Sequence, residues 1–125
     1  MVEEFHHAYG VPVGSRPTLD VGETVRALRQ SLMREELAEV CAAINRRDLI
    51  EVADGLADLL YVVYGTAITF GIDLDAVVRE VHRSNMTKLG ADGRPIYRAD
   101  GKVMKGPGFE PPRIAEVLKL AGGEH

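Results

Sequence analysis

Apolar residues recur at steps of three and four along much of the chain, which is the period of an α-helix. The second expected helix begins at Asp20, where Glu23 completes a capping box, and continues to about Arg46. Aspartates that suit the N-cap position also precede the next two helices. The four predicted helices span residues 2–9, 20–46, 48–70 and 73–89.

After Gly90 the helical period is lost, and the chain becomes rich in glycine and proline. The pair Asp100-Gly101 lies between PIYR and KVMK, which predicts a tight turn joining two short β-strands. A last short helix is expected over residues 112–120. We therefore expect an all-α fold, an oligomeric helical bundle with a short C-terminal β-hairpin, in a single domain over residues 1–125.

The longest apolar run, residues 56–70, suggests how the chain associates. It is shorter than the roughly 20 residues that span a bilayer, and Asp58 lies inside it, so we expect no membrane partner. A helix that is apolar on nearly every side needs cover on nearly every side, which a chain of this size cannot supply alone. We therefore expect a homo-oligomer, with a dimer favoured over a tetramer.

Carboxylates interrupt the apolar row of the second helix. The row runs through Leu28 and Leu32 and continues to Ala43, and the motif Glu35-Glu36-x-x-Glu39 lies between them. Residues three and four apart share a helix face, so the three carboxylates converge. Because unpaired buried carboxylates are costly, a metal ion is a common remedy.

A second acidic cluster follows on the next helix, where Glu51, Asp54 and Asp58 again share one face. A short turn between the two helices would bring both clusters together as a cage of up to six carboxylates. Ligands of this kind select Mg²⁺, with Mn²⁺ as an alternative, and Mg²⁺ is often completed by substrate phosphates. The competing interpretation is a solvated acidic face, which is the commoner meaning of one such cluster but less so of two.

Polar and basic residues downstream suit the remainder of a polyphosphate. Asn85 and Lys88 lie near the end of the fourth helix, and Lys102 and Lys105 flank the second strand of the hairpin. Lysine side chains meet phosphates as point charges. Each lysine alone is more simply explained by solubility, and Asn85 with Lys88 by the charge preference of a helix C-terminus.

Net charge and cysteine content indicate which partners and which cellular compartment to expect. The net charge of −4 argues against general nucleic-acid binding. The one cysteine, Cys41, forms no internal disulfide, and the N-terminus lacks a basic start followed by an apolar core. These features lead us to expect a cytoplasmic protein.

The paired acidic helices resemble the all-α nucleoside triphosphate pyrophosphatases, the MazG-like and dimeric-dUTPase-like group, which carry EExxE on one helix and ExxD on the next. Residues 35–39 match the first motif, and residues 51–54 can be read as the second. The later segment HRSNMTK and the stretch DGKVMKGP resemble the phosphoribosyl-ATP pyrophosphohydrolase-like branch. One departure is clear: many relatives align the ExxD motif so that its Asp falls at Asp58, which places Gly55 where their Glu would be.

This resemblance implies hydrolysis of a (d)NTP, such as dUTP or a noncanonical nucleotide, between the α and β phosphates, giving the monophosphate and pyrophosphate. It also implies interlocked bundles of two or four subunits. The implied metal ligands are Glu36, Glu39 and Asp58, with Asp54 replacing the missing Glu, and Glu51 as an outer ligand or as a group that contacts the ligands from behind. Glu35 would position or activate the attacking water, and the phosphates or sugar would be held by Asn85, Lys88, Lys102 and Lys105. Two alternatives stay open: phosphoribosyl-ATP pyrophosphohydrolase activity, and a non-catalytic, metal-stabilised oligomerisation module.

Overall fold

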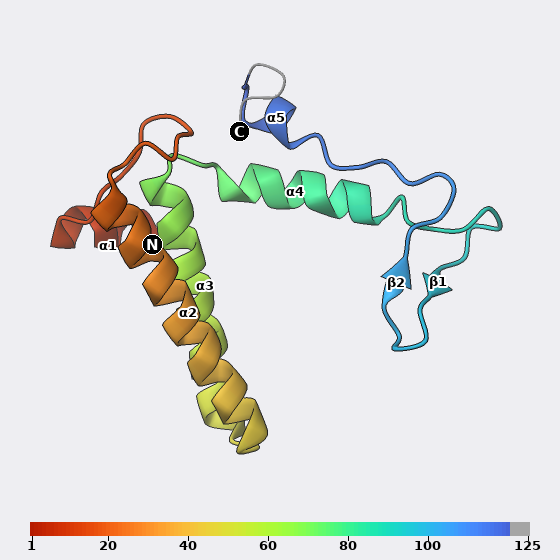
Figure 1. The fold of residues 1–125 in the computed structure, drawn as a ribbon, viewed down its shortest axis with the longest axis horizontal. Helices are drawn as coiled ribbons and strands as arrows, with labels where there is room; N and C mark the ends of the chain where they lie inside the picture. Colours follow the sequence, from red (N-terminus) through yellow and green to blue (C-terminus); the bar gives the residue numbers. More distant parts are fainter. Residues whose placement is uncertain (121–125) are drawn as a thin grey trace. The chain divides into compact units, whose positions relative to one another are not determined.

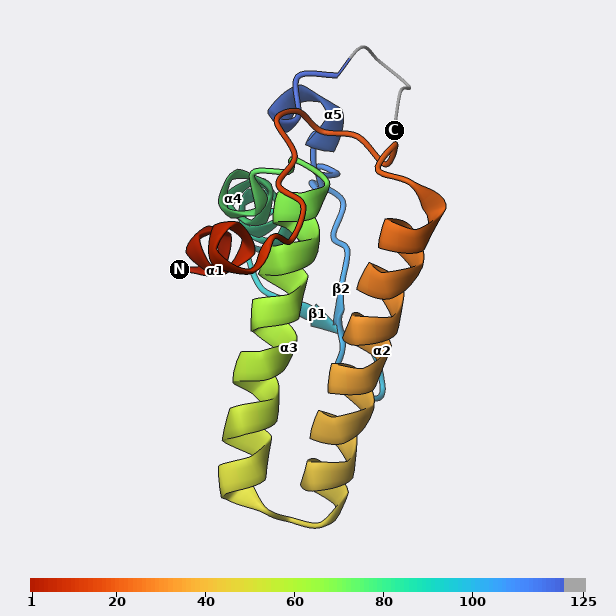
Figure 2. The same cartoon turned by 90° about the vertical axis from the view of Figure 1, so that its left-hand side faces the viewer.

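A computed structural model describes residues 1–120, which form two compact units. The first unit is residues 1–72, and the second begins at residue 73. In the first unit, α2 and α3 are long antiparallel helices lying side by side, and α1 lies against α3 (Figures 1 and 2). The three helices are α1 (Val2–Tyr9), α2 (Glu23–Asn45) and α3 (Leu49–Thr69).

Two contacts fix the register of α2 against α3. Val40 packs on Gly55, where an added Cβ would lie 3.1 Å from the Cβ of Val40. Farther along, Arg29 donates from Nε to Oγ1 of Thr66 at 3.1 Å. Few apolar side chains in the described part of the chain are fully buried, namely Val40, Ala43 and Ala67.

The starts of the long helices test the predicted caps. The Asp48 carboxylate accepts from the backbone N–H of Glu51 at 3.1 Å, which confirms that cap. The prediction for Asp20 was wrong, because α2 begins at Glu23 after Gly22, with no side-chain cap. Asp20 instead donates its backbone N–H to the Thr18 hydroxyl in the preceding turn.

The segment after α1 ties that helix to the end of α3. The carbonyl of Pro12 accepts hydrogen bonds at 3.0 Å from Nδ1 of His6 and from the hydroxyl of Thr69. The backbone N–H of Gly14 then donates to the Ile68 carbonyl at 2.8 Å. These bonds hold α1 in a defined place on α3.

The second unit contains α4 and the predicted hairpin, which pairs Ile96 with Met104 in antiparallel register. Asp73 caps α4 as predicted, but the helix ends earlier than residue 89. The hydroxyl of Thr87 donates to the Ser84 carbonyl at 2.6 Å, which closes the last turn. The elements are α4 (Leu74–Asn85), β1 (Ile96–Tyr97), β2 (Val103–Met104) and α5 (Ile114–Val117).

Charged and polar groups fasten the chain before α5 to α4. Arg83 donates to both carboxylate oxygens of Glu80, at 2.7 and 2.9 Å, and pairs with Glu110 at 3.0 Å. Glu80 also accepts from the backbone N–H of Arg113 at 2.8 Å. The pKa of Glu80 is therefore lowered to about 2, mainly by the hydrogen bond from Arg83.

The predicted all-α fold with a short C-terminal hairpin is confirmed, since the one sheet within residues 1–120 has two strands. By length and composition alone, α3 is long and apolar enough to cross a membrane. A single helix of this kind is weak evidence, because the core helices of soluble proteins pass the same test. This helix carries three carboxylates and packs along α2.

Candidate active site

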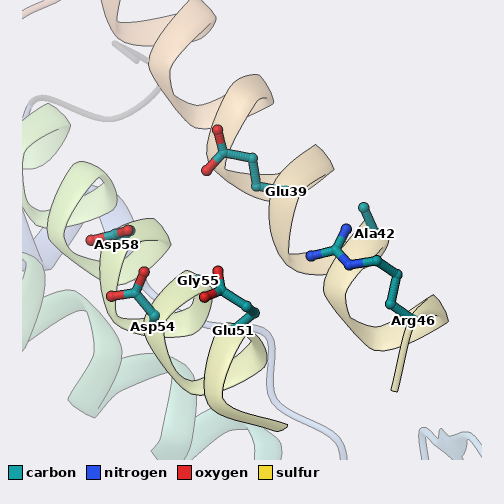
Figure 3. A pocket seen from close by; sticks show the side chains of 7 residues that line it. All are labelled: Glu39, Ala42, Arg46, Glu51, Asp54, Gly55 and Asp58. Carbon is teal, nitrogen blue, oxygen red and sulfur yellow. The ribbon is translucent and has the colours of Figure 1, made fainter. Parts of the chain in front are cut away.

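A cleft of about 180 Å³ lies between α2 and the first half of α3. Figure 3 shows carboxylates from both helices around it, with Glu39 on α2 and Glu51, Asp54 and Asp58 on α3. The two acidic motifs of the sequence are thus brought together by the antiparallel packing of their helices. The cleft is lined by Glu39, Ala42, Arg46, Glu51, Asp54, Gly55 and Asp58.

Glu36 is the least exposed carboxylate of the two acidic motifs, since it is half-buried and the others are exposed. Its Oε2 atom is buried and lacks a hydrogen-bond partner, alone among the side-chain atoms found in that state in residues 1–120. Burial raises its pKa, and the negative charges of Glu39 and Asp58, a side-chain hydrogen bond with Glu39 and the charge of Glu35 raise it further. A buried carboxylate oxygen without a donor, close to other negative charges, is a candidate ligand for a cation.

The acidic row differs from the predicted one in its phase. The α2 residues that face α3 are Arg29, Val40 and Ala43, with Glu36 between them, whereas Leu28 is 53% exposed. Glu35 and Glu39 therefore lie at the exposed edge of the helix pair rather than inside it. Within the described chain, no three His, Cys, Asp or Glu side chains converge closely enough to hold a metal ion. The carboxylates line an edge and do not close into a cage.

The structure explains why glycine occupies position 55. This residue is buried against Val40, so a side chain there would press into the contact between α2 and α3. Asp54 is exposed and lines the cleft together with Asp58, one helical turn away. Asp54 thus supplies a carboxylate to the cleft from the position next to Gly55.

Arg46 lines the cleft, and sequence reasoning missed it. Its guanidinium points into the space between the helices in Figure 3. The signal was present, because Arg46 lies seven residues after Glu39 and two helical turns return it to the same face. A cation at the mouth of an acidic cleft offsets part of its negative charge.

The second unit places three of the four predicted phosphate ligands near one another. Lys88 follows Asn85 at the end of α4, and its carbonyl accepts from the backbone N–H of Gly106 at 2.9 Å. Lys105 is adjacent to that bond, and its Nζ lies 4.9 Å from the centre of the Phe109 ring. Lys102 lies apart from them at the hairpin turn, where its backbone N–H donates to Asp100.

A family model for phosphoribosyl-ATP pyrophosphohydrolase matches residues 2–85, which is most of the chain. The chain belongs to this family. The match includes both acidic motifs and Asn85, whereas the three candidate lysines lie beyond it. The phosphoribosyl-ATP pyrophosphohydrolase family assignment places the protein among the all-α, MazG-like NTP pyrophosphatases, a superfamily of nucleotide pyrophosphohydrolases.

Two relatives support the assignment. Over 107 residues, the chain is 32% identical to the uncharacterized protein L479 of Acanthamoeba polyphaga mimivirus. That match covers 83% of the chain but 40% of the viral protein, so the chain spans less than half of that relative. A crystal structure from Exiguobacterium sp. 255-15, provisionally named an NTP pyrophosphohydrolase, matches with a TM-score of 0.52 and 27% identity. It covers 94% of this chain and 92% of its own.

Proposed function

We propose that the protein is a Mg²⁺-dependent pyrophosphohydrolase that cleaves a (d)NTP between the α and β phosphates. The products would be a nucleoside monophosphate and pyrophosphate, with dUTP or a noncanonical nucleotide as the substrate. The observation that carries this proposal is the unsatisfied Oε2 atom of Glu36 beside a cleft of carboxylates. The family assignment supplies the reaction class.

The donor set fits a hard divalent cation, because every candidate ligand is a carboxylate. Glu36, Glu39, Asp54 and Asp58 would hold Mg²⁺, or Mn²⁺ in its place, once their side chains turn toward one point, and Glu51 would lie outside them. Binding would relieve the repulsion that raises the pKa of Glu36. When bound, the cation would neutralise charge on the phosphate oxygens.

The remaining candidates have roles that need no contact with a cation. Glu35 lies at the exposed edge next to Glu36, and it would orient the attacking water and accept its proton. Attack at the α phosphorus would break its bond to the bridging oxygen, and pyrophosphate would leave with that oxygen. The phosphates or sugar would be bound by Asn85, Lys88, Lys102 and Lys105. The lysines would stabilise the negative charge that develops on the leaving pyrophosphate.

We also propose that the protein works as a homo-oligomer, with a dimer as the first expectation and a tetramer as the alternative. Leu49, Leu56 and Leu60 are between 53% and 80% exposed. At about 100° per residue they point at least about 120° away from Asp54, so they form a separate apolar edge of α3. Apolar exposure on this scale is typical of an interface. A monomeric mass by light scattering at micromolar concentration would contradict this proposal.

The decisive test of the reaction is a Mg²⁺-dependent screen for pyrophosphate release from canonical and damaged dNTPs. Glu39→Gln and Asp58→Asn should each reduce turnover at least 100-fold, because charge stabilisation at the phosphates is worth several kcal/mol. Glu4→Gln on α1 is the matched control and should retain full activity. Helical circular dichroism must persist in every variant, and full activity in both cleft variants would refute the proposal.

The same screen separates the two alternatives. Selective turnover of phosphoribosyl-ATP would favour the activity named for the matching family model. A non-catalytic module would show metal-dependent melting without release of pyrophosphate from any nucleotide.

A further inference from the structure

Three aromatic side chains of the first unit form an exposed cluster across α1 and α3. The ring centre of Phe5 lies 4.6 Å from that of Tyr9, and 5.7 Å from that of Tyr61 in an edge-to-face contact. The three residues are 42%, 72% and 41% exposed. Tyr9 buries little of itself, so docking α1 on α3 does not account for all of this aromatic surface.

The cluster is held in place by neighbours that are themselves buried. His6 follows Phe5 and is 2% exposed, and its Nδ1 is bound to the Pro12 carbonyl. That carbonyl also accepts from Thr69 near the end of α3. The rings are therefore carried by a helix with a fixed position and not by a loose terminus.

Tyr61 lies on the acidic face of α3. At about 100° per residue, Asp54, Asp58 and Tyr61 point within about 60° of one another. Tyr61 is also three residues beyond Asp58, a rise of about 4.5 Å along the helix. By this geometry Tyr61 lies on the same side of α3 as Asp54 and Asp58, just beyond the end of the cleft at Asp58, and away from the apolar edge around Leu56.

We propose that Phe5, Tyr9 and Tyr61 bind the base of the nucleotide whose phosphates occupy the acidic cleft. This inference rests on the proposed function and names how that site takes its substrate. In a nucleotide only the sugar separates the base from the first phosphate, so a base site must lie close to the phosphate site. Exposed aromatic rings stack on nucleobases with little preference among them, since every base has a π-face.

Stacking distant from the reacting phosphorus contributes to binding in the ground state and the transition state alike. Tyr61→Leu and Tyr9→Ala should therefore raise KM for a dNTP about 5- to 100-fold and leave kcat near its wild-type value. Tyr61→Phe should restore KM, because it keeps the ring. Tyr97→Leu, on the exposed strand β1, is the matched control and should change neither constant.

A substrate without a base gives a second readout. Inorganic tripolyphosphate should be hydrolysed or bound equally by wild-type protein and by Tyr61→Leu. An unchanged KM for the dNTP in folded Tyr61→Leu and Tyr9→Ala would overturn the inference. Tyr9→Ala serves where Tyr61→Leu fails to fold, because Tyr9 is the most exposed of the three.

Equilibrium dialysis with a nucleoside 5′-monophosphate keeps the two proposals distinguishable. If no nucleotide is hydrolysed, the proposed function fails. The aromatic site still predicts that wild-type protein binds the monophosphate at least 5-fold more tightly than Tyr61→Leu does. Equal binding by the two proteins would overturn the aromatic site by itself.

Discussion

Arg29 and Glu36 lie two turns apart on the face of α2 that packs against α3. Arg29 is 6% exposed, and it donates to Thr66 at 3.1 Å and to the Val62 carbonyl at 3.0 Å. Glu36 has a buried oxygen with no partner. Burial moves both groups toward neutrality, since it lowers the pKa of Arg29 and raises that of Glu36. Within residues 1–120, the fold supplies hydrogen-bond partners to Arg29 and none to the Oε2 atom of Glu36.

Gly65 shows how closely the surroundings of Arg29 are fitted. A Cβ at this position would lie 2.6 Å from Nη2 of Arg29 and 2.9 Å from Nε2 of His6. The absent side chain makes room for the guanidinium between the two long helices. The Arg29 region is therefore a packed structural element, whereas the Glu36 region is open along one edge.

The largest effect on stability is expected from Arg29→Met. The change removes both hydrogen bonds and leaves the Thr66 hydroxyl and the Val62 carbonyl with one donor fewer, at a cost of about 1–3 kcal/mol. Urea unfolding followed by circular dichroism measures it. Arg34→Met is the control, because Arg34 is exposed and donates to the exposed side chain of Gln30, so its change should stay within about 0.5 kcal/mol. If Arg29→Met were as stable as wild type, the hydrogen bonds of Arg29 would not distinguish it from Glu36.

Glu36→Gln should act in the opposite direction when no divalent cation is present. Removing a charge that is half-buried and repelled by Glu39 and Asp58 should stabilise the protein by at most about 1 kcal/mol, because solvent screens part of the repulsion, and should raise Tm by a few degrees. Thermal melting in EDTA measures the change. Adding Mg²⁺ should then raise the Tm of wild type and have little effect on the variant.

Glu4→Gln is the matched control for this measurement, because Glu4 is exposed on α1 and should respond to neither condition. A Glu36→Gln protein that melts below wild type in EDTA would show that the carboxylate is satisfied within the fold.

Local sequence signals predicted the helices because the interactions that define them are local. Asp48 and Asp73 each cap the helix that follows within three residues. Periodicity also placed Asp54 and Asp58 on a shared face, where the structure finds them lining one cleft. Features of this kind depend on the 3.6-residue repeat and on short-range hydrogen bonds.

Other features depend on contacts that are distant in the sequence. The early end of α4 is stabilised by the Ser84 hydroxyl, which donates to the carbonyl of Glu110 at 2.8 Å. In the sequence, Gly55 looks like the loss of a metal ligand, and only its packing on Val40 shows that an added Cβ would crowd the contact between α2 and α3. The phase error along α2 has the same origin, since tertiary packing selected the row through Arg29 and Glu36.

The smallest expected effect is on the pH dependence of stability. Here Glu36 can be compared with Glu80, a carboxylate that has hydrogen-bond partners. The pKa of Glu80 is lowered from 4.5 to about 2 by its hydrogen bonds from Arg83 and Arg113. Its contribution to stability is present above pH 4.5 and is lost as the pH falls through about 2. The contribution of Glu36 to stability has the opposite pH dependence. It is present below the ordinary glutamate pKa of 4.5 and is lost as the pH rises through the higher pKa of Glu36 in the folded protein.

Carboxyl-carbon NMR titration without divalent cations should therefore show Glu80 titrating below the ordinary glutamate range and Glu36 above it. Glu80→Gln should flatten the acid side of the stability curve between pH 4.5 and 2, and it should leave the titration of Glu36 in place. Addition of Mg²⁺ should lower the pKa of Glu36 and leave that of Glu80 unchanged, because a bound cation favours the ionised form of a carboxylate that it contacts. If both carboxylates titrated together, the distinction between a group paired by the fold and a group left for a ligand would be lost.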